Sequence, residues 1–149
     1  MLANKNEQSF TAIQWFNKGY DYDVKEDYDN AIFAYTKSIE LNPQDADAYN
    51  NRGAAYDTKG EYDLAITDYT KTIELNPQDA DAYYNRGAVY AVKGEYDLAI
   101  TDYDKMIELN PQDVYGYISK VFACEKSGHY TNSQIEAVKQ KIRDLDGHI

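Results

Sequence analysis

The chain has 149 residues, of which 43% are hydrophobic, and 26 acidic against 15 basic residues give it a formal net charge of −11 at pH 7. This length suits one domain with a buried core. The acidic balance disfavours binding to nucleic acid or anionic membranes and favours a neutral or basic protein partner. One cysteine cannot form an internal disulfide, and two histidines without nearby cysteines argue against a zinc site, so we expect no metal or cofactor.

At the N-terminus, the stretch MLANKNEQSF contains no basic segment followed by an apolar run. We therefore expect no signal peptide. No segment approaches the roughly 20 apolar residues that a membrane span needs, which predicts a protein without membrane insertion. The simplest expectation is a soluble, cytoplasmic protein.

A 34-residue repeat organises the rest of the chain. Residues 46–79 match residues 80–113 at 28 of 34 positions, and residues 12–45 follow the same period more loosely. A degenerate fourth copy occupies residues 114–149, and residues 1–11 form an N-terminal extension. A period of this length is typical of stacked units, each too small to bury its apolar face alone.

Each copy contains two segments in which small and apolar residues recur at a spacing of three to four, which predicts two amphipathic helices. Gly60 separates the two segments as a helix-ending residue, and Pro77 cannot continue the second helix. The side chain of Asp79 can cap the helix that follows. In chain order we expect helices near residues 12–25, 28–42, 46–59, 62–75, 80–93, 96–109, 114–127 and 131–145.

The recurring positions resemble the tetratricopeptide repeat: two aromatic places around a glycine, then an alanine, a tyrosine and a proline, here Tyr49, Gly53, Tyr56, Ala65, Tyr69 and Pro77. The first copy starts with Trp15, as many such repeats do. The resemblance implies an all-α, right-handed superhelical solenoid of antiparallel helix pairs, with three clear repeats and a degenerate fourth pair that caps the stack.

Two features depart from the repeat. Glu26 replaces the helix-ending glycine found at Gly60, and a left-handed backbone there would cost about 1 kcal/mol. The apolar residues of the last expected helix, Ile135, Val138 and Ile142, lie 35 rather than 34 residues after their counterparts in the third copy. This spacing predicts a slip of one residue, and the polar remainder of the helix is typical of a terminal cap.

Thirteen of the 16 tyrosines occupy recurring aromatic places, and we expect them to pack between helices. The other three, Tyr20, Tyr84 and Tyr115, fall on the first helix of a pair, on the side turned away from its partner helix. These three are therefore candidates for binding rather than for packing.

Arg52 and Arg86 precede the recurring glycines of their copies and are expected to point away from that side. We expect them to form structural ion pairs with Asp68 and Asp102 on the paired helix. Such pairs contribute little to stability if they are exposed.

In the family, the side turned away from the partner helix lines a concave groove that holds peptide segments. The resemblance implies a groove formed by Phe16, Asn17, Tyr20, Asp47, Asn50, Asn51, Asp81, Tyr84, Asn85, Tyr115, Ile118 and Phe122. An asparagine amide can both donate to and accept from a peptide backbone. The alternative is that the asparagines make only local hydrogen bonds and that the aspartates act as helix caps.

Some family members bind the C-terminal carboxylates of chaperones with two lysines, an arginine and two asparagines. At the matching positions this chain has Phe16, Tyr20, Asn51, Asp81 and Asn85, of which only Asn51 agrees. We therefore expect no carboxylate clamp, because the acidic groove would repel a terminal carboxylate.

No motif favours an enzyme. The stretch DYDVKEDYD at residues 21–29 lacks the central glycine of a calcium loop, and no phosphate-binding loop or nucleophile motif occurs. Cys124 falls where the repeat places a packed tyrosine, which predicts a buried, inert thiol. His129 lies in a turn, without an expected catalytic neighbour, and His148 is the penultimate residue.

These features predict a non-enzymatic scaffold whose groove binds a peptide with apolar or aromatic anchors and basic flanks. The alternative is a self-associating structural protein that uses its terminal helices and groove aromatics. Ile118 and Phe122 motivate that alternative, as does the charge: each of the first three copies carries −4 (7 acidic, 3 basic), and residues 114–149 carry +1 (4 acidic, 5 basic). The sequence therefore leaves two alternatives, a peptide-binding scaffold and a homo-oligomer.

Overall fold

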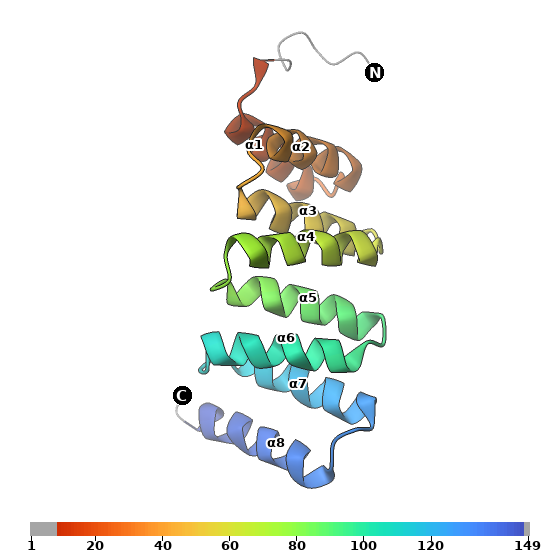
Figure 1. The fold of residues 1–149 in the computed structure, drawn as a ribbon, viewed down its shortest axis with the longest axis vertical. Helices are drawn as coiled ribbons and strands as arrows, with labels where there is room; N and C mark the ends of the chain where they lie inside the picture. The colour runs from red at the N-terminus through yellow and green to blue at the C-terminus, as the bar shows by residue number, and fades with distance from the viewer. Residues whose placement is uncertain (1–8, 148–149) are drawn as a thin grey trace. The chain divides into compact units, whose positions relative to one another are not determined.

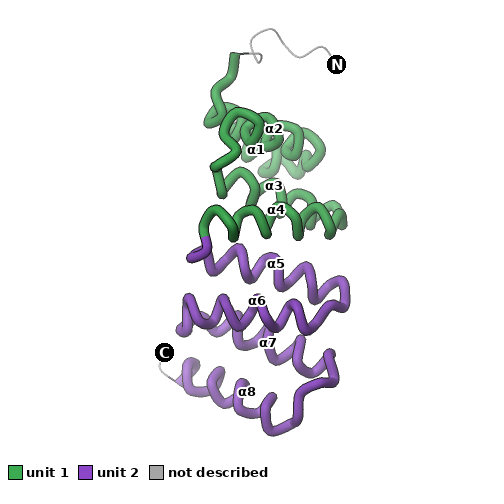
Figure 2. The backbone as a smooth tube through the Cα atoms, in the orientation of Figure 1, with its two compact units in different colours: residues 1–76 green, residues 77–149 purple. Residues whose placement is uncertain are grey.

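The computed structural model describes residues 9–147, which contain eight α-helices and no strand. The all-α prediction is confirmed for this part of the chain. The backbone divides into two compact units, residues 1–76 and 77–149 (Figure 2). None of the helices among the described residues is both long and apolar enough to cross a membrane. The expectation about a signal peptide concerns residues that lie largely outside the described range.

Unit 1 contains α1 (Ala12–Val24), α2 (Tyr28–Leu41), α3 (Ala46–Thr58) and α4 (Tyr62–Leu75) (Figure 1). Each helix packs against the next one in the chain as an antiparallel neighbour, and α1 also contacts α3. The observed bounds agree with the expected ones to within one residue. This agreement has a local cause, since α1 to α3 each follow a residue whose side chain caps the helix.

Unit 2 contains α5 (Ala80–Val92), α6 (Tyr96–Leu109), α7 (Val114–Ser127) and α8 (Asn132–Asp146), and α5 also contacts α7 (Figure 1). The predicted slip of one residue is wrong, because Asn132 begins α8 36 residues after Tyr96 begins α6, which is a shift of two. Tyr130 now precedes the helix, yet its side chain still packs against the core around Cys124 and Ile135. The longer loop thus keeps the aromatic contact while the helix starts later.

The two helices of a pair approach closely at a glycine. A Cβ atom added to Gly53 would lie 3.1 Å from the ring of Tyr69 on the paired helix, and one added to Gly87 would lie 2.9 Å from the ring of Tyr103. Because the tyrosine rings occupy the space that a side chain would need, only glycine fits without a shift of the helices. Tyr69 and Tyr103 are buried, as the packing interpretation of the repeated tyrosines requires.

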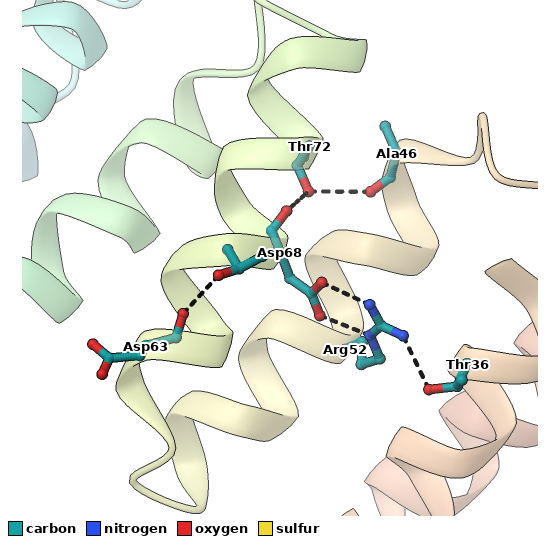
Figure 3. Close-up of polar contacts among 7 residues, drawn as sticks. Thr36, Ala46, Arg52, Asp63, Asp68 and Thr72 are labelled. Atoms are coloured by element: carbon teal, nitrogen blue, oxygen red, sulfur yellow. Dashed lines mark hydrogen bonds and ion pairs between the residues drawn. The ribbon is translucent and has the colours of Figure 1, made fainter.

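A buried ion pair joins the second pair of helices (Figure 3). Arg52 donates from Nε and Nη2 to the two carboxylate oxygens of Asp68, at 2.7 and 2.8 Å, and from Nη1 to Thr36 on α2, at 3.0 Å. The side chain of Asp68 is 4% exposed and that of Arg52 is 17% exposed. Both expected pairs form, with Arg86 and Asp102 at 2.7 and 2.8 Å in unit 2. Because these pairs are largely buried, we expect them to affect stability more than exposed pairs do.

The turn after α1 contains the only non-glycine residue with a positive φ among the described residues, Glu26 at 58°. Its N–H donates to the carbonyl of Asp23, and the next N–H, of Asp27, donates to the carbonyl of Tyr22. Gly60 makes the same pattern at φ 75°. The left-handed conformation is therefore required by the turn, and Glu26 adopts it against the preference of a residue with a Cβ.

We predict that Glu26→Gly stabilises the protein by about 0.5–1 kcal/mol, because it removes the left-handed strain while the turn keeps its hydrogen bonds. Chemical unfolding followed by helical circular dichroism measures this change. Gly60→Ala is the matched control, and it should destabilise the protein because it introduces the same strain. Equal stability of Glu26→Gly and the wild type would contradict the prediction.

Removing the carboxylate of Asp68 should be far more costly. Asp68→Asn leaves the Arg52 guanidinium without its charged partner between α2 and α4, and we expect a loss of about 3 kcal/mol in the free energy of unfolding. Glu74→Gln on the same helix breaks only an exposed pair with Lys71 and should cost less than about 0.5 kcal/mol. Similar losses of stability in the two variants would show that the buried pair contributes no more than the exposed one.

Candidate functional site

The expected groove residues lie on the first helices of the pairs, six in each unit. In unit 1, α1 carries Phe16, Asn17 and Tyr20, and α3 carries Asp47, Asn50 and Asn51; we call this set the unit 1 face. In unit 2, α5 carries Asp81, Tyr84 and Asn85, and α7 carries Tyr115, Ile118 and Phe122, which form the unit 2 face. Within each unit the two contributing helices are in contact.

The unit 1 face presents one exposed aromatic side chain beside a packed one. Tyr20 is 57% exposed, whereas Phe16 is half-buried with its ring centroid 5.6 Å from that of Tyr35 on α2. Asn17 and Asp47 are exposed. The face therefore offers a ring, an amide and a carboxylate to solvent.

Tyr35 forms a hydrogen-bonded floor under this face. Its hydroxyl donates to the carboxylate of Asp23 at 2.6 Å, and the amide of Asn51 is hydrogen-bonded to the same hydroxyl. Burial, reinforced by the Asp23 carboxylate, raises the pKa of Tyr35 well above its ordinary value, and burial also raises the pKa of Asp23. Asn51 is thus engaged locally, as the alternative interpretation of the asparagines states. Asn50 and Asn85 also have interaction partners.

The aspartates of the two faces are not the helix caps. The side chain of Asp45 accepts from the N–H groups at the start of α3, and that of Asp79 does so for α5. Asp47 and Asp81 instead lie in the first turns of these helices and are exposed. Their carboxylates remain directed to solvent, where a positively charged group could reach them.

The unit 2 face contains an open pocket of about 330 Å³. Its lining combines side chains of α5, α6 and α7 with the residue that caps α7: Asp81, Tyr84, Met106, Asp113 and Tyr115. Tyr84 is half-buried, with its ring centroid 5.9 Å from that of Tyr103, and Tyr115 is 65% exposed. The pocket therefore brings together an apolar lining and two carboxylates.

Sequence reasoning missed Met106 and Asp113 as members of this pocket. Met106 stands where the second copy has Thr72, so the difference between the copies was a usable signal. Asp113 caps α7 by accepting from the N–H of Tyr115 at 2.9 Å, and this capping role concealed its place in the lining. Conversely, Asn85, Ile118 and Phe122 do not line the pocket.

Ile118 and Phe122 extend the unit 2 face along α7. Both side chains are about half-exposed. The Phe122 ring meets Tyr96 edge-on, with centroids 6.5 Å apart, and the amine of Lys126 lies 5.8 Å from its centroid. This part of the face is a continuous apolar strip rather than a cavity.

The remaining reactive side chains lie outside both faces. Cys124 is buried, as predicted, and burial raises the pKa of its thiol. His129 contacts Asp97 at 3.0 Å in an exposed pair that sequence reasoning missed, because the two residues are 32 positions apart. Across residues 9–147, no group of three or more histidine, cysteine or acidic side chains is placed to hold a metal ion.

Comparison with known protein families agrees with the fold that the structure shows. The tetratricopeptide repeat model matches residues 46–79 and 80–113, and a second TPR repeat model matches residues 19–60. No curated protein sequence matches the chain.

Solved structures resemble the chain over most of its length. A crystal structure of MamA aligns with a TM-score of 0.87 at 29% identity, covering 92% of this chain and 79% of that one. The first TPR of Spaghetti (RPAP3), bound to the HSP90 peptide SRMEEVD, aligns with a TM-score of 0.76 at 26% identity, covering 79% of this chain and 94% of that one. The Arabidopsis OM64 TPR domain, at 24% identity and a TM-score of 0.73 over 76% of this chain and 94% of that one, shares the fold. The family matches span more than half of the sequence, and the chain therefore belongs to the tetratricopeptide repeat family.

Proposed function

We propose that this protein is a non-enzymatic scaffold that binds a peptide segment whose apolar or aromatic anchor is flanked by basic residues. The tetratricopeptide repeat fold is a protein-interaction fold, and the neighbour Spaghetti (RPAP3) is seen with a bound peptide. The unit 2 face provides the main contact in this proposal, and the unit 1 face provides a second one. In this proposal the four repeats comprise residues 12–45, 46–79, 80–113 and 114–149.

The pocket of the unit 2 face is the observation that carries the proposal. An anchor side chain of aromatic or long aliphatic type would contact Tyr84, Met106 and Tyr115, burying apolar surface on both partners. A lysine or arginine next to the anchor would reach the carboxylates of Asp81 and Asp113. The two tyrosine rings would also favour a cation above their faces.

The charge of the two faces selects against an acidic peptide. The peptide bound by Spaghetti (RPAP3), SRMEEVD, ends in a run that contains three acidic side chains. In this chain the corresponding surface carries Asp47 in unit 1 and Asp81 in unit 2, both exposed. Like charges that face each other lower affinity and slow association, so the preferred peptide should have the opposite sign.

A second candidate function is self-association. The half-exposed strip of Ile118 and Phe122 on α7 supports it, because exposed apolar strips of this kind often mark interfaces. Light scattering over a range of protein concentrations, at low and high salt, separates the two functions. If the protein is a monomer at every concentration, self-association is excluded. If it forms a dimer or larger species that becomes monomeric in Phe122→Ser, self-association is favoured over peptide binding.

Selection from a phage-displayed library of random dodecapeptides tests the peptide proposal directly. We expect enriched sequences with an aromatic or large aliphatic residue next to lysine or arginine. The Asp81→Asn, Asp113→Asn double variant should weaken a selected peptide by about tenfold, which corresponds to roughly 1.4 kcal/mol. Asparagine is also a good N-cap, so α7 keeps its capped start in this variant.

Further variants make the outcome specific. Replacing both Tyr84 and Tyr115 by alanine should also weaken binding at least tenfold, and Tyr20→Ala should have a smaller effect if unit 1 supplies a secondary contact. Glu108→Gln, which neutralises an exposed carboxylate of α6 outside the pocket, should leave affinity unchanged. Enriched peptides without basic residues, or equal affinity for the double aspartate variant, would refute the proposal.

A further inference from the structure

The inner copies fill the space between three successive helices with a charged network, and the last copy does not. In unit 1 this network joins Thr36, Arg52 and Asp68, which are the ninth residue of α2 and the seventh residues of α3 and α4. The carboxylate of Asp68 accepts both of the Arg52 hydrogen bonds that cross between α3 and α4 (Figure 3). The third helix thus supplies the anion of the network.

The same three helix positions in unit 2 hold a different set of groups. The ninth residue of α6 is Asp104, the seventh residue of α7 is Lys120, and the seventh residue of α8 is Val138. Lys120 forms an ion pair with Asp104 at 2.5 Å, toward α6. On the α8 side, Val138 and its neighbour Ala137 offer no carboxylate. The cation remains, and the anion of the third helix is missing.

An open pocket of about 370 Å³ lies at this place, lined by residues of α6, α7 and α8. Its apolar walls come from Ile107, Tyr117 and the two small α8 residues Ala137 and Val138. The hydroxyl of Tyr117 donates to the carbonyl of Pro111 at 3.1 Å, so the hydroxyl already has a partner and the ring is available as a wall. The volume falls within the range of small-molecule sites.

Two amines and one carboxylate line the pocket, which gives it an excess of one positive charge. Lys120 uses one of its three N–H donors on Asp104, which leaves donors for another acceptor. Lys141, the tenth residue of α8, also lines the pocket, and its amine forms no hydrogen bond or ion pair with the part of the chain that the structure describes. The polar groups of the pocket are therefore arranged for an anion.

We propose that this pocket binds a small organic carboxylate, whose anion stands between Lys120 and Lys141 where the inner copies place an aspartate side chain. The body of the ligand lies against the Tyr117 ring and Val138, so an aromatic or branched aliphatic acid fits better than acetate. A small molecule fits better than a peptide, because the group that is missing from α8 is one carboxylate rather than a length of chain. This pocket shares no lining residue with the pocket of the unit 2 face.

Phenylacetate is a suitable probe, with phenylacetamide as the uncharged ligand of the same shape and acetate as the charged ligand without a ring. Titration of the ¹⁵N-labelled full chain should produce saturable shifts of the amide signals of Ile107, Ala137 and Val138. We expect phenylacetamide and acetate each to bind at least fivefold more weakly than phenylacetate. This contrast would show that both the charge and the ring contribute.

Two variants test the assignment of the site. Lys141→Gln removes an exposed amine of the pocket and should weaken phenylacetate binding at least threefold, whereas Lys105→Gln, at the tenth position of α6 and outside the pocket, should not. Val138→Asp places a carboxylate on α8 at the position of Asp68 and should abolish binding. If Val138→Asp fails to fold, Lys141→Gln still decides the question.

The proposal is overturned if phenylacetamide binds as tightly as phenylacetate, if the shifts lie elsewhere in the chain, or if Lys141→Gln binds like the wild type. It is also overturned if a capped tripeptide with glutamates on either side of phenylalanine binds this pocket and phenylacetate does not, because the site would then belong to a protein partner. None of these results bears on the peptide selection, which concerns Asp81, Tyr84 and Tyr115.

Discussion

The contact between a glycine on one helix and a tyrosine ring on its partner is the constraint on which the inner repeats depend. The glycine is the eighth residue of α1, α3 and α5, and the tyrosine is the eighth residue of α2, α4 and α6. At Gly19 a Cβ atom would lie 2.6 Å from the ring of Tyr35, closer than real Cβ contacts come. The ring therefore fixes both the separation of the helices and the side of the first helix that stays uncovered.

That uncovered side carries the candidate binding residues, and the same packing explains their character. Because the glycine and the arginine before it face the second helix, the residues on the opposite side of the first helix are less closely packed than these two. These positions include three of the six differences between the second and third copies: Asn50 against Tyr84, Asp57 against Ala91 and Thr58 against Val92. The repeated residues build the fold, and the differing ones give each unit its own surface.

Much of the fold could be predicted from the sequence because its signals are local. Helix ends depend on a capping side chain or a left-handed residue within the same turn, and the bounds were therefore accurate to one residue. Burial of the Arg52–Asp68 pair was not predicted, since Arg52 also contacts Thr36 of a third helix. The pocket lining was incomplete for a similar reason: Met106 and Asp113 reach it from other elements, through side-chain directions that spacing within one helix does not give. The two-residue shift of α8 depends on where Tyr130 packs, which spacing alone misjudged.

The last pair of helices shows what happens when the glycine and tyrosine are both lost. The eighth residue of α7 is Val121, and the eighth residue of α8 is Lys139, which forms an ion pair with Glu125 at 2.8 Å instead of packing a ring on the backbone. A valine side chain at this position cannot admit a ring at the distance that glycine allows. The helix α8 therefore lacks the contact between ring and glycine that joins α6 to α5. The last helix is thus held mainly by Ile135 and its apolar neighbours, and the space that the inner copies fill with charge stays open beside Lys120.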